Sequence, residues 1–304
     1  MDLRRLEVFC KVVELRSFTK AAEAVLLSQP TISEHVRSLE ETLGEKLLDR
    51  LGREAFPTPA GQILYRYAQK MLRLREEAVQ AIASYKGELS GQLVLGASTI
   101  PGTYILPKII GSFKAQHASV QLMLRISSSG KIVEAVLRGD LEIGLIGSQW
   151  KDRRLKLEEI CSEELVLAVY PGHPWAKREE VGMEEVYGQP FILRERDSGT
   201  RMVMSQILET RDFDFSRLST VAEVATTQAV VQSIKAEIGI SILSRLAVEE
   251  DLQRGSLVAV PIRGVRFHRP FYLIQRINRQ LSPLCEAFLM HVRMESEGKN
   301  SRDR

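Results

Sequence analysis

The sequence has few cysteines, and their positions exclude two common uses of that residue. Cys10, Cys161 and Cys285 lie far apart, and none belongs to a CxxC pair or a Cys/His cluster. A disulfide framework and a structural zinc site both need such pairing, so neither is expected. We interpret the three as packed thiols, with a redox switch as the alternative, and we expect neither a metal nor a cofactor.

Catalytic signatures are also missing. No serine stands in a Gly-x-Ser-x-Gly elbow, the histidines are scattered, and no P-loop or dinucleotide fingerprint is present. His173 lies in the run Pro-Gly-His-Pro-Trp, which is typical of a turn. We therefore expect a protein that is not an enzyme.

Long apolar runs are absent from the chain. The N-terminus carries no apolar stretch followed by small residues, and no later segment reaches the length of a membrane span. We therefore expect a cytoplasmic protein with no membrane partner. Its 304 residues, 44% apolar and 27% charged, suffice for two or three ordinary globular domains.

A large excess of positive charge is lacking as well. The formal net charge is +3, and the first 60 residues hold nine Lys and Arg against ten Asp and Glu. Gross electrostatics therefore do not indicate a nucleic-acid partner, and any DNA binding must depend on where the basic residues lie.

Residues 17–50 are the most informative stretch of the chain. One short helix is predicted by small and apolar groups on one face, and a second by an apolar stripe at spacings of four, three and four. Ser28 is a good N-cap, and Pro30 falls in the first turn, where its missing N–H has no helical partner. The two faces consist of Ala21, Ala22, Val25 and Leu26, and of Ile32, Val36, Leu39 and Leu43.

Short polar groups and an arginine remain on the outer side of this second helix, which should begin near Gln29. A helix-turn-helix uses such groups to read base edges in the major groove. A small helical hairpin with a solvated polar face would show the same pattern, so both interpretations stay open on these residues alone.

The flanking segments extend this unit. Residues 3–15 predict a covering helix with Leu3, Leu6, Phe9 and Val13 on its apolar face. Residues 46–57 predict a short β excursion, the wing of a winged helix, with Arg50 and Arg53 as phosphate or minor-groove contacts. For either arginine a solvated side chain is the alternative.

This arrangement resembles the LysR-type transcriptional regulators of bacteria over essentially the first 87 residues. Two positions depart from the family's pattern, because Glu34 stands where many members have a basic residue and Leu48 where many have Phe. The residues that fall in the family's order and spacing are Phe18, Ala21, Ala22, Ser28, Gln29, Pro30, Ser33, Leu39, Glu40, Leu43, Gly44, Leu47, Arg50, Thr58, Pro59, Ala60 and Gly61.

The resemblance implies sequence-specific binding to double-stranded DNA at an inverted repeat. Glu34 is the open position, since it either accepts from a cytosine amino group or discriminates between sites by repelling phosphate. The predicted DNA-binding residues are Lys20, Gln29, Pro30, Thr31, Ser33, Glu34, Arg37, Ser38, Arg50 and Arg53.

A long helix should follow over residues 59–87, with Thr58 as N-cap and Pro59 at its first position. It would be about 40 Å long and has few apolar groups away from one heptad seam. We therefore favour pairing with a second copy over packing in its own chain, and the resemblance implies the same. The predicted seam is Leu64, Tyr67, Met71, Leu74, Ala78, Ala81 and Tyr85.

From residue 91 short apolar runs alternate with amphipathic helices, which predicts an α/β domain with mostly parallel sheets. We place two subdomains at about 91–165 with 267–294 and at about 166–266, and a flexible polar tail at 295–304. The expected strands are 93–97, 120–126, 143–146, 165–170, 191–194, 220–224, 240–243, 257–262 and 271–275, and the expected helices 105–113, 131–138, 200–208, 226–235 and 283–294.

Three strand-to-helix turns of this domain carry hydroxyl groups, at residues 98–101, 127–130 and 197–200. Ligands of α/β folds bind at the carboxyl ends of strands, where helix N-termini direct N–H groups outward. Each serine or threonine could instead cap its own helix, but three converging turns favour a pocket for a small anion. Arg194 and Arg196 either add charge there or pair with Glu195 and Asp197.

The resemblance implies that this domain looks like a periplasmic binding protein, with an effector in the cleft between its subdomains. The predicted effector-binding residues are Ser98, Thr99, Ser129, Gly147, Ser198, Gly199 and Thr200.

We thus expect a DNA-binding transcriptional regulator controlled by a small molecule. Its partners would be double-stranded DNA, the effector and further copies of itself as a homodimer or homotetramer, with RNA polymerase as an additional candidate. A cytoplasmic solute-binding or sensor protein without specific DNA binding is the alternative. It accounts for residues 91–290 but leaves the first 87 unexplained.

Overall fold

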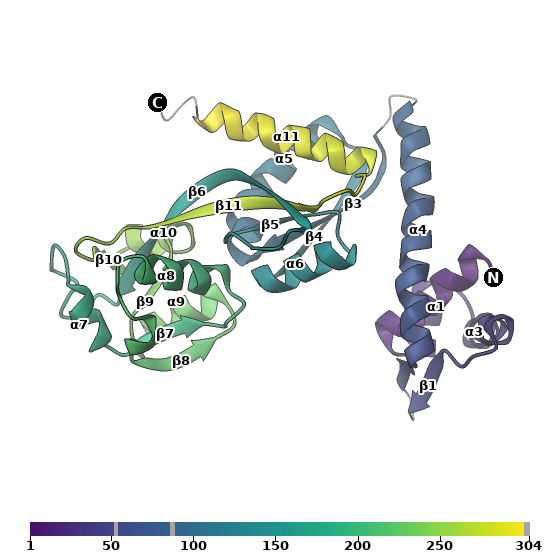
Figure 1. Cartoon of the computed structure of the whole chain (residues 1–304), viewed down its shortest axis with the longest axis horizontal. Coiled ribbons are helices and arrows are strands. Elements are labelled where there is room, and N and C mark those ends of the chain that lie inside the picture. The colour runs from purple at the N-terminus through teal and green to yellow at the C-terminus, as the bar shows by residue number, and fades with distance from the viewer. Residues whose placement is uncertain (52–53, 86–88, 301–304) are drawn as a thin grey trace. The chain divides into compact units, whose positions relative to one another are not determined.

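The computed structural model describes residues 1–51, 54–85 and 89–300 (Figure 1). It divides into two compact units, Met1–Glu88 and Leu89–Arg304. Each unit has hydrophobic core clusters of its own. No helix in the described ranges is both long and apolar enough to cross a membrane.

The first unit is a winged helix-turn-helix, as predicted. Ser17 and Ser28 cap its second and third helices by accepting hydrogen bonds from the Lys20 and Thr31 N–H groups. Gly44 ends the third helix with a φ of 72°, a conformation that glycine adopts without strain. The helices are α1 (Leu3–Leu15), α2 (Phe18–Ala24) and α3 (Gln29–Leu43).

The wing is an antiparallel hairpin of β1 (Leu48–Leu51) and β2 (Glu54–Pro57), which leads into α4 (Pro59–Tyr85). Thr58 joins these parts, because its hydroxyl donates to the Lys46 carbonyl at 2.7 Å and accepts from the Gly61 N–H at 3.0 Å. A side chain at Gly61 would collide with the Leu47 carbonyl, which explains why glycine follows this cap by three residues.

Several apolar residues do not pack where their spacing predicted. Leu3 and Leu43 are exposed, while Val8 and Val12 take part in the core of the first unit beside Leu6 and Phe9. Leu26 is 91% exposed, because the chain leaves α2 before this residue and turns there with a positive φ of 55°. The predicted apolar faces of α1, α2 and α3 were therefore partly wrong at their ends.

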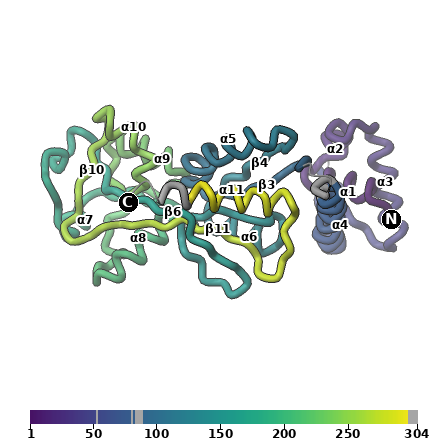
Figure 2. Tube along the Cα trace, turned by 90° about the horizontal axis from the view of Figure 1, so that it is seen from above, coloured from purple at the N-terminus to yellow at the C-terminus, as the bar shows by residue number. Residues whose placement is uncertain are grey.

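The second unit begins with a subdomain whose parallel strands follow the order β4-β3-β5. Helices α5 and α11 cover one face of these strands and α6 the other (Figures 1 and 2). Its elements are β3 (Gly91–Ser98), the π-helical turn η1 (Pro101–Ile105), α5 (Leu106–Gln116), β4 (Val120–Ser127), α6 (Ser129–Arg138), β5 (Ile143–Ile146) and α11 (Pro283–Asn300).

The other subdomain places α7 and α8 against one apolar cluster and α9 and α10 against another. Strands β7 and β8 pair in parallel. Its elements are α7 (Met183–Tyr187), β7 (Phe191–Arg194), α8 (Gly199–Glu209), the 3₁₀ turn η2 (Phe215–Arg217), β8 (Thr220–Val224), α9 (Thr227–Lys235), β9 (Ser241–Ser244), α10 (Arg245–Gln253) and β10 (Val258–Val260).

Two long antiparallel strands, β6 (Leu155–Val169) and β11 (Phe267–Arg276), run through both subdomains (Figure 1). Strand β11 also pairs with β5, and the far end of β6 pairs with β9 and β10, all antiparallel. The expectation of mostly parallel sheets was therefore wrong, because the connecting strands make the sheet mixed.

Other boundaries also differ from the sequence-based ones. Strand β6 begins ten residues before the expected start at 165, and its added part is rich in glutamate, which hides the strand pattern. Helices α7 and α10 were not predicted. Helix α11 continues past Met294 to Asn300, so most of the expected flexible tail is helical.

Candidate functional site

The outer face of α3 presents most of the predicted DNA-reading groups to solvent. Gln29, Pro30, Glu34 and Arg37 are exposed, and Thr31, Ser33 and Ser38 are half-buried. The Gln29 side-chain amide donates to Ser33 Oγ at 3.1 Å, and Arg37 Nε donates to Glu41 Oε1 at 2.9 Å. Exposed bonds of this kind contribute little stability, so bases can replace them at small cost.

Other basic residues of this unit have structural partners. Arg4 donates to the Val25 carbonyl at 3.1 Å and so holds the turn between α2 and α3. Lys46 pairs with Glu40, whose carboxylate also accepts from the Leu47 N–H at 2.9 Å at the start of the wing. Arg4 thus ties α1 to the turn before α3, and Glu40 ties α3 to the start of the wing.

The wing arginine that the structure describes lies over an aromatic ring. The guanidinium carbon of Arg50 is 4.3 Å from the centre of the Phe18 ring, an arrangement that leaves its N–H groups free to reach a phosphate. Lys20 is exposed on α2. Arg53, the other predicted wing contact, lies outside the described residues.

Helix α4 exposes part of the predicted seam. Tyr67, Leu74, Ala78 and Ala81 are exposed, whereas Leu64 is 9% exposed and belongs to the core of its own unit. Met71 is half-buried against the same core, and the Tyr85 side chain lies outside the described residues. The exposed apolar stripe also includes Ile63 and Ile82, which the heptad spacing did not select.

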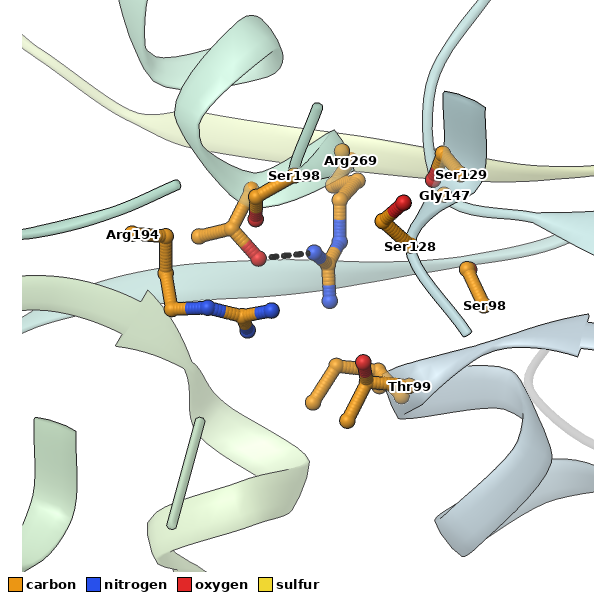
Figure 3. Close-up of a pocket in the computed structure, with 11 residues that line it drawn as sticks. Ser98, Thr99, Ser128, Ser129, Gly147, Arg194, Ser198 and Arg269 are labelled. Atoms are coloured by element: carbon orange, nitrogen blue, oxygen red, sulfur yellow. Dashed lines mark hydrogen bonds between the residues drawn. The ribbon is translucent and has the colours of Figure 1, made fainter. Parts of the chain in front are cut away.

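A small pocket in the second unit gathers the predicted effector-binding residues. All seven of them line it, from the ends of β3 and β5 and the starts of α6 and α8 (Figure 3). The residues that join them are Ile100, Ser128, Arg194 and Arg269.

Several hydrogen-bond donors of this pocket have no partner in the described part of the protein. Ser128 caps α6, but the Ser198 side chain at the start of α8 makes no capping hydrogen bond, so it is available to a ligand. Ser129 Oγ and Arg269 Nε are buried, and neither has a hydrogen-bond partner among the described residues. Since buried donors without partners are costly, the pocket favours an acceptor with several oxygens.

Two buried arginines face the pocket (Figure 3). Arg194 forms a two-bond pair with Glu195 at 2.8 Å and donates to Thr227 Oγ1 at 2.6 Å. Arg269 pairs with Glu163, and burial lowers the pKa of its guanidinium although this carboxylate acts in the opposite direction. Arg196 is exposed and does not line the pocket.

Gly199 lines the pocket, as predicted, and also allows its walls to come close together. A Cβ at this position would lie 2.7 Å from Ser129 Oγ and 3.0 Å from the Gly147 carbonyl oxygen. The N–H of Gly130 meets the Asp197 carbonyl at 3.5 Å beside it. The two walls of the pocket therefore approach each other at glycines, and Gly199 permits this approach.

Sequence reasoning missed Arg269 although a signal was present. Arg269 alternates with Phe267 and Phe271 along β11, and all three are buried on one face of that strand. An arginine on the apolar face of a strand is a candidate for a buried ion pair or a ligand contact.

The remaining titratable groups do not suggest another site. Burial lowers the pKa of His173, and its Nδ1 accepts from the Trp175 N–H at 3.2 Å, as expected of a turn residue. Burial raises the pKa of Cys10 to about 12 and that of Cys285 well above its usual value, which disfavours reactive thiolates. The described residues contain no group of three metal-ligating side chains.

Comparison with known proteins identifies both units. Residues 3–62 match the model of the bacterial regulatory helix-turn-helix protein, lysR family, and residues 86–297 match the LysR substrate binding domain. A probable RuBisCO transcriptional regulator of Trichormus variabilis is 32% identical, covering 95% of this chain and 87% of its own. A probable RuBisCO transcriptional regulator of Cyanidium caldarium is 31% identical, and the match covers 95% of this chain and 92% of that protein.

Solved structures share the fold. CbnR complexed with its target DNA has a TM-score of 0.73 at 21% identity, over 97% of this chain and 99% of its own. The regulatory domain of Synechocystis CcmR in complex with 2-PG has a TM-score of 0.62 at 21% identity. The match covers 68% of this chain and 98% of that domain. The chain therefore belongs to the LysR family of DNA-binding transcriptional regulators, which join a helix-turn-helix to an effector-binding domain.

Proposed function

We propose that this regulator is cytoplasmic and binds an inverted-repeat DNA site as a homo-oligomer under the control of a small anion. The proposed domains are the winged helix-turn-helix at 1–58, the dimerisation helix at 59–87 and the effector domain at 91–294. The observation that carries the anion is the pocket itself, in which hydroxyls, helix N-termini and two buried arginines converge.

DNA recognition is assigned to α3 and the wing. Gln29 and Arg37 are exposed on the outward face of α3, and their present hydrogen-bond partners lie one turn away on the same helix. Such side chains can turn to base edges without disturbing the fold. Arg50, placed over Phe18, is assigned to the phosphate backbone.

Self-association is assigned to the exposed stripe of α4, with a second copy as its partner. Tyr67 and Leu74 present large apolar groups to solvent along a helix of 27 residues, and only another apolar surface would remove them from water. Leu64 is removed from the proposed seam because it packs in its own unit, and Ile63 takes its place.

The ligand is proposed to be a small oxyanion, with carboxylates and phosphate esters as its chemical class. Helix N-termini and hydroxyls stabilise negative oxygens, and arginine binds them in two-bond geometry. No aromatic ring lines the pocket among its described residues, so a large apolar effector is disfavoured. The 2-PG bound to the CcmR regulatory domain makes it a rational first compound for this chain.

Fluorescence anisotropy of the full chain on a duplex from directly upstream of its own gene would test this proposal. We expect preference over a scrambled duplex, an affinity that falls steeply with salt, and a changed affinity when phosphate or 2-PG is added.

Two outcomes would count against the proposal. Equal binding to both duplexes would favour a sensor without specific DNA binding. Specific DNA binding with no response to any anion, together with no anion binding by calorimetry, would overturn the assignment of the pocket.

A further inference from the structure

Arg269 is the most deeply buried charged group of the pocket. It is 2% exposed, it lies on β11, and its guanidinium points into the pocket between Arg194 and the Ser128 turn (Figure 3). Its terminal nitrogens donate to Thr200 Oγ1 at 2.6 Å and to Glu163 Oε1. A guanidinium has five N–H groups, so these two bonds leave others for a ligand, among them the unpartnered Nε.

Glu163 is the counter-charge that holds Arg269. Its side chain is 4% exposed, and its other oxygen accepts from Ser244 Oγ at 2.6 Å. Because this carboxylate is almost inaccessible to solvent, its attraction for Arg269 is only weakly screened. An anion in the pocket would meet the same guanidinium from the other side and would be repelled by Glu163.

The pair lies where the two subdomains are joined. Glu163 and Arg269 are directly opposite each other in the ladder of β6 and β11, next to an irregularity in register at Phe271 and Tyr272. Two residues further on, Leu165 of β6 also pairs with Ser244 of β9. The ion pair therefore links both connecting strands to β9 and, through Thr200, to the start of α8.

We propose that Arg269 anchors the anionic effector and that Glu163 is a built-in competitor for it. Ligand binding draws the guanidinium from Glu163 toward the pocket and thereby alters the packing of β6, β11 and α8 at the subdomain junction. The protein exchanges between two states. In one the Arg269–Glu163 pair is strong, and in the other Arg269 binds the ligand, so the ligand shifts the population toward the second state. This inference rests on the proposed anion pocket.

The test is calorimetric titration of the full chain with inorganic phosphate and, separately, sulfate. Glu163→Gln keeps a hydrogen-bonding side chain of the same shape and removes the competing charge. We expect it to bind the anion roughly tenfold more tightly than wild type, since that factor is what a modest buried charge interaction produces. Glu164→Gln is the matched control, because Glu164 is the neighbouring glutamate, is half exposed and pairs with Arg245 instead.

A second variant tests Arg269 itself without leaving a buried, unpaired charge. Arg269→Gln alone would leave Glu163 buried without its partner, so it is combined with Glu163→Gln to give a neutral pair. This double variant should melt as a folded protein and bind neither anion. If the double variant bound phosphate or sulfate as tightly as wild type does, Arg269 would not be the anchor.

The outcomes separate the two proposals. If wild type binds phosphate and Glu163→Gln binds it equally or more weakly, the competition is refuted while the anion pocket stands. Binding by Glu163→Gln alone supports the competition and indicates a stronger anion as the natural ligand. If neither protein binds, both proposals fail.

The coupling to DNA has its own readout. Without ligand, Glu163→Gln should change operator affinity in the same direction in which the anion changes that of wild type. No change, or a change in the opposite direction, refutes the link between this ion pair and the DNA-binding response.

Discussion

Leu26 shows how a single residue can conflict with its local backbone. It occupies the turn between α2 and α3 with a φ of 55° and a side chain that contacts almost nothing. The left-handed conformation costs a leucine about 1–2 kcal/mol, and no packing compensates for it here. Glycine would adopt this conformation without strain.

Leu26→Gly is therefore expected to raise the stability of the DNA-binding unit by about 1 kcal/mol, less the greater chain entropy of glycine in the unfolded state. Thermal melts of residues 1–85 or of the full chain would measure it. Leu26→Ala is the control, because alanine keeps the strain. A lower melting temperature for the glycine variant than for the alanine variant would show that relief of backbone strain at this position does not outweigh the chain entropy of glycine.

Arg37 is the residue on which the DNA interface can be tested most directly. Arg37→Ala should weaken specific DNA binding by about 1–3 kcal/mol, as for an arginine that contacts a base, while the melting temperature changes little. Arg254→Ala is a matched control, since Arg254 forms the same exposed pair with a glutamate one helical turn away at 3.1 Å. Equal DNA binding by the two variants would exclude Arg37 from the reading surface.

At the scale of elements, the start of α8 decides the shape of the proposed effector pocket. It brings Ser198, Gly199 and Thr200 against the Ser129 turn and Gly147, with no room for an additional carbon atom at Gly199. The start of this helix thus contributes hydroxyl groups to the lining of the pocket, and its glycine allows the two subdomains to approach closely.

Gly199→Ala should keep the pocket from closing and lower anion affinity at least tenfold, while basal DNA binding survives. Gly111→Ala is the control within α5, because a Cβ there meets nothing within 4 Å. In a helix interior that change should stabilise the protein by about 0.5–1 kcal/mol. Calorimetric titration and thermal melts would test both; unaltered anion binding by Gly199→Ala would mean that the ligand does not need the two walls of the pocket this close together.

At the scale of the whole molecule, the exposed apolar stripe of α4 is the feature that indicates pairing with a second subunit. Tyr67 and Leu74 repeat at heptad spacing on the side of the helix that does not pack against α1 and the wing. A dimer would place two reading helices at a fixed separation, which an inverted-repeat site requires.

Leu74→Glu is predicted to dissociate this dimer, because a buried unpaired carboxylate in the seam costs several kcal/mol. Sedimentation velocity at micromolar concentration should then show monomers, and operator affinity should fall far more than in Arg75→Glu, which alters the charge of an adjacent exposed residue. An unchanged oligomer would place the interface elsewhere.

Local chemistry in the sequence was sufficient to predict where several helices begin and which residues line the pocket. Ser28 before Gln29-Pro30 and Thr58 before Pro59 set the starts of α3 and α4, because caps and prolines act within one helical turn. The hydroxyl-rich turns 98–101, 127–130 and 197–200 each follow a strand, which is why all seven predicted pocket residues meet in one place.

Only the tertiary structure decided which groups meet across large sequence separations. Leu64 and Leu74 fit the same heptad seam, yet Leu64 packs within its own unit, because the body of the winged helix covers one side of the start of α4. Glu163 and Arg269 are 106 residues apart, and neither carries a local motif. Their pairing depends on the register of β6 against β11, which arises from packing over both strands and which no short stretch of sequence specifies.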